Sequence, residues 1–208
     1  MTQEVLEALA RESLRGRTLL VATTDLDSRR TVFWNLTLMA EVRGPGTLAL
    51  VREILVASAA IPGELPPAMI DVEVAGKRYQ EMHVDGGTTA QVFLLPRDIL
   101  LSDLAFRKRT VYVIRNARLH ALPREVPRNA VEIAKNAIAS LIHTQGIGNI
   151  YQIAARAERD GSALRIAFIP DSFTQEGGEG FDHEYMNELF LLGYTMASRG
   201  FPWLTAPP

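Results

Sequence analysis

The sequence predicts an α/β fold in which a largely parallel sheet is flanked by helices. Nearly continuous runs of apolar and β-branched residues at 18–24 and 110–114 are typical of strands that are buried on both faces. Segments with apolar residues at helical spacing alternate with these runs, and strands that alternate with helices favour parallel pairing. The chain has 208 residues, 47% of them hydrophobic, which is enough for one sizeable core. We therefore expect a single domain over residues 1–208.

The first 40 residues predict a helix followed by two neighbouring strands. Apolar residues set among acids and arginines at 3–15 are typical of a short amphipathic helix. The apolar run at 18–24 ends at Asp25, and a β-prone, aromatic run follows at 31–37 after a turn-like segment. We therefore expect these two runs to form a hairpin or to lie side by side in the sheet.

Residues 48–60 predict the next helix, because apolar side chains recur there at three- and four-residue spacing. Pro62 and Gly63 end this helix. Ser58 lies in its run of small residues, without the glycines that surround a nucleophilic serine. We therefore interpret Ser58 as a packing residue.

A second hairpin is predicted by residues 72–74 and 78–84, which flank a turn at 75–77. Side chains alternate between the two faces of a strand, so those of alternate residues share one face. On one face of the second strand lie Tyr79, Glu81, His83 and Asp85. Asp85 stands at the end of that strand, where open α/β sheets place their chemistry, and it is our candidate functional carboxylate.

Asp85, Gly86 and Gly87 form a junction between this strand and a predicted helix. Thr88 and Gln91 have the spacing of a capping box, so we expect the helix to begin at the glycines and to continue through residues 92–94. The free N–H groups at such a helix start favour the ionised form of a nearby carboxylate. From spacing alone, Asp85 is either a functional carboxylate or an acid that caps a tight turn.

The second half of the chain continues the alternation of helices and strands. We expect a helical connection at 97–109, whose basic end is solvated surface, and then the strand at 110–114. Asn129 is placed to cap a helix that Gly146 and Gly148 interrupt, after which a second helix continues.

The last third predicts a strand at 164–169, a polar loop at 171–181 and a final helix capped by Asp182. The expected buried stripe of that helix is Met186, Leu189, Phe190, Gly193 and Ala197.

Composition excludes several classes of function. The net charge of −2, from 22 basic and 24 acidic residues that are well mixed, gives no basic footprint, so we expect no nucleic-acid partner. The lack of cysteine excludes thiolate metal sites and cysteine nucleophiles. The sequence as written contains no signal peptide and no apolar window of membrane-spanning length, which is compatible with a cytoplasmic location.

Three kinds of site can be weighed around Asp85. Acyl transfer needs a serine on a sharp Gly-x-Ser-x-Gly turn and an oxyanion hole, and no serine here has glycine at both two-residue offsets. A metal site on Glu81, His83 and Asp85 lacks a second histidine at ligand spacing. Gly86 and Gly87 have the wrong spacing for a Rossmann or P-loop signature. We therefore expect no metal and no cofactor.

Five stretches of the chain carry a family likeness when they are taken together. They are residues 20–27, 34–35, 55–63, 82–87 and 194–208. Asp-Gly-Gly alone is a weak motif, but here Ala-Ser-Ala-Ala-Ile-Pro-Gly precedes it at a suitable distance. With these stretches the chain resembles, over nearly its whole length, the C-terminal portion of the patatin-like phospholipases, the plant storage lipid hydrolases and their bacterial relatives.

The resemblance implies a Ser-Asp dyad without histidine. In the family, a serine in Gly-x-Ser-x-Gly attacks an ester carbonyl and the aspartate of Asp-Gly-Gly acts as its base. Asp85 matches that aspartate, and Gly86 and Gly87 match its supporting turn. The nucleophile and the oxyanion loop of the family lie upstream of every matching stretch. The resemblance therefore implies a lipid acyl hydrolase, a phospholipase A or esterase, of which this chain supplies the aspartate but not the serine and is inactive alone.

A second interpretation stays open, in which the chain is a non-catalytic α/β interaction module or a pseudoenzyme. In either case the nucleophile strand and helix of the family are absent from this sequence, so we expect an unpaired sheet edge and an exposed apolar face. Such an edge favours self-association. For the complete enzyme, the implied partners are a lipid or small ester substrate and a membrane surface.

Overall fold

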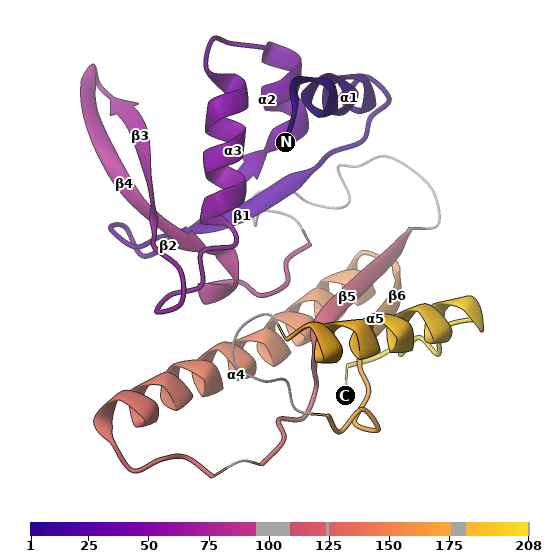
Figure 1. Ribbon diagram of the computed structural model, residues 1–208. Coiled ribbons are helices and arrows are strands. Elements are labelled where there is room, and N and C mark those ends of the chain that lie inside the picture. Colours follow the sequence, from indigo (N-terminus) through magenta and orange to yellow (C-terminus); the bar gives the residue numbers. More distant parts are fainter. Residues whose placement is uncertain (95–108, 124, 176–181, 208) are drawn as a thin grey trace. The chain divides into compact units, whose positions relative to one another are not determined.

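The computed structural model describes residues 1–94, 109–123, 125–175 and 182–207 and divides into two compact units, Met1–Gln91 and Val92–Pro208 (Figure 1). Both units combine helices with strands, so the predicted α/β class is confirmed. The expectation of one domain over residues 1–208 stays a prediction.

The first unit contains a four-stranded sheet with helices against it (Figure 1). Its elements are α1 (Gln3–Ser13), β1 (Leu20–Asp25), β2 (Arg30–Asn35), α2 (Leu36–Val42), α3 (Thr47–Ala57), β3 (Ala68–Val74), β4 (Lys77–Asp85) and the 3₁₀ turn η1 (Gly86–Thr88). The strand order is β2-β1-β4-β3, and every neighbouring pair is antiparallel. The helix at 3–15, both hairpins and the helix at 48–60 are thus found where the sequence predicted them.

The expected largely parallel sheet is not confirmed in this unit. Only residues 26–29 connect β1 to β2 and residues 75–76 connect β3 to β4, and such short connections join antiparallel neighbours, because a parallel pair needs a longer crossover. The nearly continuous apolar run that suggested parallel pairing belongs to β1, whose last four residues are buried. A central antiparallel strand covered on both faces has the same sequence pattern.

The sheet consists of two hairpins joined along one short seam. The β1–β2 hairpin and the β3–β4 hairpin each have long ladders. Between β1 and β4, in contrast, the paired residues are Thr23 with Asp85, Thr24 with Val84, and Asp25 with His83. We call this three-pair ladder the seam, and Asp85 lies at one end of it.

The core of the first unit lies between this sheet and its helices. Helix α3 packs on β1, β3 and β4 and buries Val51, Ile54 and Ala57, which contact Ile70 of β3 in one apolar cluster. The helix α2 was not predicted; it begins where the Asn35 side chain accepts a hydrogen bond from the Leu38 N–H.

The second unit contains a parallel strand pair connected by a long helix (Figure 1). Its elements are β5 (Thr110–Arg118), α4 (Ala130–Arg159), β6 (Ala163–Ile169) and α5 (His183–Ser198). The strands β5 and β6 are parallel, as expected of strands linked by a helical crossover. Its core packs Val111, Val113 and Ile166 of the strands against Ile150 and Ile153 of α4.

Two helix predictions for this unit are wrong in detail. Helix α4 continues through Gly146 and Gly148, because each interior glycine costs only about 1 kcal/mol and the helix is anchored there by buried Ile150 and Ile153. Helix α5 has the expected position, but Met186 and Phe190 of its predicted buried stripe are exposed. The partly buried positions of α5 follow a different face: Tyr185, Glu188, Leu189, Leu192, Thr195 and Met196. The predicted helical spacing of the buried positions was right, but the predicted face of α5 was wrong.

Three predicted segments lie outside the helices and strands that the structure describes. The helix predicted through residues 92–94 is replaced by bends after η1. Apart from Arg109, the helical connection predicted at 97–109 lies outside the described residues, as does the part of the polar loop at 176–181. No helix in the described part of the chain is long and apolar enough to cross a membrane.

Candidate functional site

Asp85 closes β4 and caps the turn that follows it. Its Oδ1 atom accepts a hydrogen bond of 2.6 Å from the Gly87 N–H, which makes it the N-cap of η1. The side chain is half-buried. The capping role that the sequence allowed is therefore present, while the second carboxylate oxygen has no hydrogen-bond partner among the described residues.

Three segments that are distant in sequence meet at the Asp85 backbone. The Asp85 N–H donates to the carbonyl oxygen of Ala60, just beyond α3, at 2.9 Å. The Asp85 carbonyl accepts from the Thr24 hydroxyl of β1 at 3.0 Å. The backbone of Asp85 is therefore fixed by a hydrogen bond at its N–H group and another at its carbonyl group.

At both Gly86 and Gly87 a side chain would collide with a neighbouring atom. A Cβ on Gly86 would lie 2.4 Å from the carbonyl oxygen of Ala22 in β1, and a backbone atom there cannot move aside. A Cβ on Gly87 would lie 2.9 Å from Oδ1 of Asp85. The first glycine thus permits close contact with β1, and the second leaves the carboxylate in its capping position.

A buried chain of hydrogen bonds runs beside Asp85, and we call its four members, Trp34, Thr23, His83 and Glu81, the Trp34–Glu81 network. The fully buried His83 ring has Nδ1 at 2.9 Å from the Thr23 hydroxyl and Nε2 at 3.2 Å from Oε2 of Glu81. The Trp34 Nε1–H donates to the same Thr23 hydroxyl at 2.8 Å. Glu81 and His83, which share one face of β4, are thus bonded to each other.

The donors and acceptors of this network determine the tautomer of a neutral His83. Trp34 can only donate and an ionised Glu81 can only accept. The hydroxyl of Thr23, which receives the Trp34 hydrogen, can donate its own to Nδ1, and His83 then donates Nε2–H to Glu81. The Trp34 N–H, the Thr23 hydroxyl and both ring nitrogens of His83 then have hydrogen-bond partners, as burial requires.

Asp25, which pairs with His83 across the seam, is a buried carboxylate next to the network. Its Oδ1 accepts from the N–H groups of Asp27 at 3.0 Å and Ser28 at 3.3 Å, and the Ser28 hydroxyl donates to Oδ2. Burial alone would raise the pKa of Asp25, but the side-chain and backbone hydrogen bonds of Ser28, that of Asp27 and the nearby His83 lower it below its usual value. Asp25 is therefore an ionised anchor of the β1–β2 turn and a weak base.

The other site types weighed from the sequence are not assembled. Glu81, His83 and Asp85 do not form a metal cluster, since no group of three or more candidate ligands occurs in the described ranges. The Ser58 hydroxyl donates to the Leu55 carbonyl at the end of α3, consistent with a packing role. Within those same ranges no serine hydroxyl bonds to Asp85.

Sequence reasoning missed Thr23, Thr24 and Trp34 as members of the site. A signal was available, because Thr23, Thr24 and Asp25 are polar residues at the end of a run that was expected to be buried. Buried polar side chains need hydrogen-bond partners, so their presence in such a strand predicts a polar network even where the partners cannot be named.

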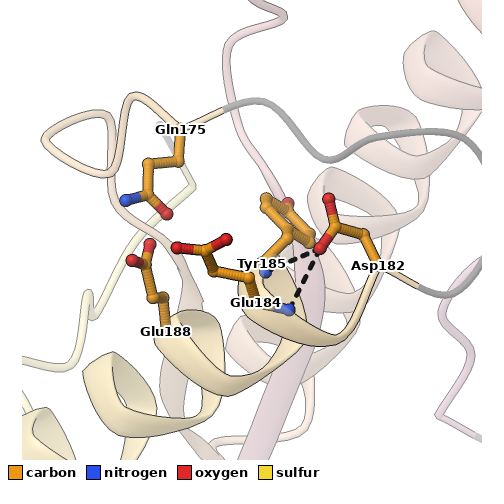
Figure 2. Close-up of a pocket in the computed structure, with 5 residues that line it drawn as sticks. All are labelled: Gln175, Asp182, Glu184, Tyr185 and Glu188. Atoms are coloured by element: carbon orange, nitrogen blue, oxygen red, sulfur yellow. Dashed lines mark hydrogen bonds between the residues drawn. The ribbon is translucent and has the colours of Figure 1, made fainter.

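A surface hollow in the second unit is lined by acidic side chains at the start of α5 (Figure 2). Its lining residues are Gln175, Asp182, Glu184, Tyr185 and Glu188. Oδ1 of Asp182 accepts hydrogen bonds from the N–H groups of Glu184 at 3.0 Å and Tyr185 at 3.1 Å, drawn as dashed lines in Figure 2. The predicted capping role of Asp182 is confirmed, and it gives this carboxylate a structural function.

No protein-family model matches the chain, and no curated protein matches it either. The patatin-like resemblance therefore rests on the five sequence stretches alone.

Proposed function

We propose that this chain supplies the aspartate of a patatin-like Ser-Asp lipid acyl hydrolase, with Asp85 as the catalytic base. The observation that carries the proposal is that three of the resembling stretches, 20–27, 55–63 and 82–87, meet at Asp85 through the Thr24 hydroxyl and the Ala60 carbonyl. Chance likeness spread along a chain has no reason to converge on one carboxylate.

The position of Asp85 suits the chemistry of a general base. A base must reach the hydroxyl proton of the nucleophile at hydrogen-bond distance. One oxygen of Asp85 is held by the Gly87 N–H, and the other is available on a half-buried side chain. The serine oxygen would attack the ester carbonyl as its proton passes to Asp85, and the alcohol would leave with that proton. Water, deprotonated in turn by Asp85, would then attack the acyl-serine, and the serine oxygen would leave with that proton as the acid is released.

The nucleophile of this mechanism comes from a segment outside this sequence, upstream of the resembling stretches. The largely parallel sheet of the family would then be completed by strands from that segment. The substrate is a lipid or a small ester, bound where a membrane surface can deliver it. The chain alone is expected to hydrolyse no ester.

Hydrolysis of p-nitrophenyl butyrate tests the proposal. The 208-residue chain should give no turnover above buffer, whereas the chain joined to its upstream Gly-x-Ser-x-Gly segment should be active. Asp85→Asn should lower kcat of the joined protein by about 10³-fold or more. Glu73→Gln, an exposed change on β3, is the matched control and should leave kcat unaltered. Full activity of the Asp85 variant would refute the proposed base.

A non-catalytic interaction module is the second candidate, and exposed apolar side chains are expected of it as they are of an incomplete hydrolase. Tyr112 and Ile114, on one face of β5, are 62% and 73% exposed, and Phe190 of α5 is 70% exposed. Such faces are typical of surfaces that bind another protein or a second copy. Sedimentation of the chain between 5 and 200 µM tests it: concentration-dependent association that Ile114→Thr weakens would support this candidate.

A further inference from the structure

The position of Asp85 relative to β1 depends on the seam between the two hairpins. The ladders within the hairpins are long, but the seam has three pairs, and Asp85 is one of its six residues. A slip or opening at the seam would move Asp85 away from β1 without unfolding either hairpin. Side-chain bonds across the seam therefore help to hold the carboxylate in register, in addition to the Thr24 hydroxyl and the Ala60 carbonyl that bond to the Asp85 backbone.

The Trp34–Glu81 network crosses this seam in its fully buried part. Thr23 belongs to β1 and is the direct strand partner of Asp85. His83 belongs to β4, two residues before Asp85 and on the same strand face. Neither Thr23 nor His83 has any exposed surface, so water cannot replace the hydrogen bond between them.

Trp34 and Glu81 add further contacts that orient the Thr23 hydroxyl and the His83 ring. Trp34 of β2 donates to Thr23, and its ring centroid lies 5.7 Å from that of His83 at an angle of 59°. Glu81, a third of which is exposed, accepts at the outer end of the imidazole. Strands β2, β1 and β4 are thus tied together through one hydroxyl and one ring.

We infer that His83 is a positioning residue for Asp85, acting through the Thr23 hydroxyl to hold β4 in register on β1. The catalytic part of this inference rests on the proposed function, because it concerns the position of Asp85 as the general base. Positioning matters in such a reaction, since a displacement of about 1 Å can cost on the order of 100-fold in rate.

Exchange of the Gly87 N–H reports on how the Asp85 turn is seated on β1, because this N–H donates to the Asp85 carboxylate and the adjacent Gly86 packs against Ala22 of β1. Amide hydrogen exchange measured by NMR on the 208-residue chain should show exchange at Gly87 and Asp85 about tenfold faster in Thr23→Val, which keeps the shape of the side chain but removes its hydroxyl. Thr23→Ser keeps the hydroxyl and should restore slow exchange. Amides of Val72 and Tyr79 within the β3–β4 ladder, away from the seam, should change little in both variants.

A second variant and a control complete the experiment. His83→Phe keeps a buried ring without its two hydrogen bonds and should reproduce the faster exchange, which keeps the test decisive if Thr23→Val does not fold. Thr37→Val removes another buried hydroxyl, one that bonds to Asn35 and to the Leu19 N–H away from Asp85. It should leave exchange at Gly87 unchanged. Unaltered exchange at Gly87 in a folded Thr23→Val or His83→Phe chain would overturn the inference.

Kinetics of the protein joined to its upstream segment separate this inference from the proposed function. Thr23→Val should lower kcat about 10- to 100-fold with KM within a factor of two, and Thr23→Ser should recover most of kcat. An inactive joined protein whose Gly87 exchange still responds to Thr23→Val would refute the hydrolase and retain the register role. An active protein in which Thr23→Val changes neither exchange nor kcat would retain the hydrolase and refute the positioning role.

Discussion

Gly86 lies so close to Ala22 that a side chain on it would have to occupy the same space as the Ala22 carbonyl. A Cβ at residue 86 would be 2.4 Å from that oxygen and 2.7 Å from its carbon. The contact joins the turn after Asp85 to the central strand of the sheet. The first glycine of the Asp-Gly-Gly motif, Gly86, is therefore required for steric reasons that are independent of any catalytic role.

Gly86→Ala should destabilise the first unit by about 1–3 kcal/mol, because β1 and η1 must separate to admit the methyl group. Urea unfolding followed by circular dichroism measures the change. A variant as stable as the parent chain would contradict the close contact.

Gly148→Ala, in contrast, should stabilise the second unit by about 0.5–1 kcal/mol. Gly148 lies inside α4, and a Cβ there meets no atom within 4 Å. Alanine restricts the unfolded chain and favours the helix. Thermal unfolding of the chain should show a higher midpoint, and a lower midpoint would indicate that α4 is broken at this glycine.

Asp25→Asn should lower the stability of the first unit by about 1–3 kcal/mol at pH 7, because the buried carboxylate accepts bonds from Asp27 and Ser28. The pKa of Asp25 is lowered in the folded chain. Its stabilising contribution is therefore complete above the unfolded pKa of about 3.9 and disappears as the pH falls through the lower folded value.

The difference in unfolding free energy between the parent chain and Asp25→Asn should consequently be constant from pH 5 to 8 and shrink below about pH 4. Urea unfolding at a series of pH values measures it. Asp71→Asn, on an exposed side chain of β3, is the matched control for the substitution itself. A difference that grows on acidification would mean that the pKa of Asp25 is raised.

Asp85→Ala should cost about 0.5–2 kcal/mol of stability, the usual range for losing an N-cap side chain. Urea unfolding of this variant beside Asp85→Asn measures the effect. A loss within that range leaves the chain folded, so kinetic losses in the same variants can be assigned to chemistry. A cost above about 4 kcal/mol would mean that Asp85 is mainly a structural residue.

Both hairpins, the helix at 3–15 and the caps at Asn129 and Asp182 could be predicted from the sequence, because local spacing and turn residues control them. The antiparallel pairing of β1 with β4, which joins the two hairpins into one sheet, could not. A buried run such as β1 has the same composition in a parallel or an antiparallel sheet, and only the lengths of the connecting segments distinguish the two. The stripe of α5 shows a related limit, since several of its faces are apolar and packing alone selects which one is covered.

The sequence by itself determined that Asp85 ends a strand and is followed by two glycines, because strand alternation and turn chemistry are local properties. Only the tertiary structure decided what surrounds it. The contacts of Asp85 and Gly86 with Thr24, Ala60 and Ala22, and the bond between His83 and Thr23, join residues as distant in the sequence as Ala22 and Gly86. Such contacts depend on strand register, which is set by burial of the whole sheet rather than by any one segment.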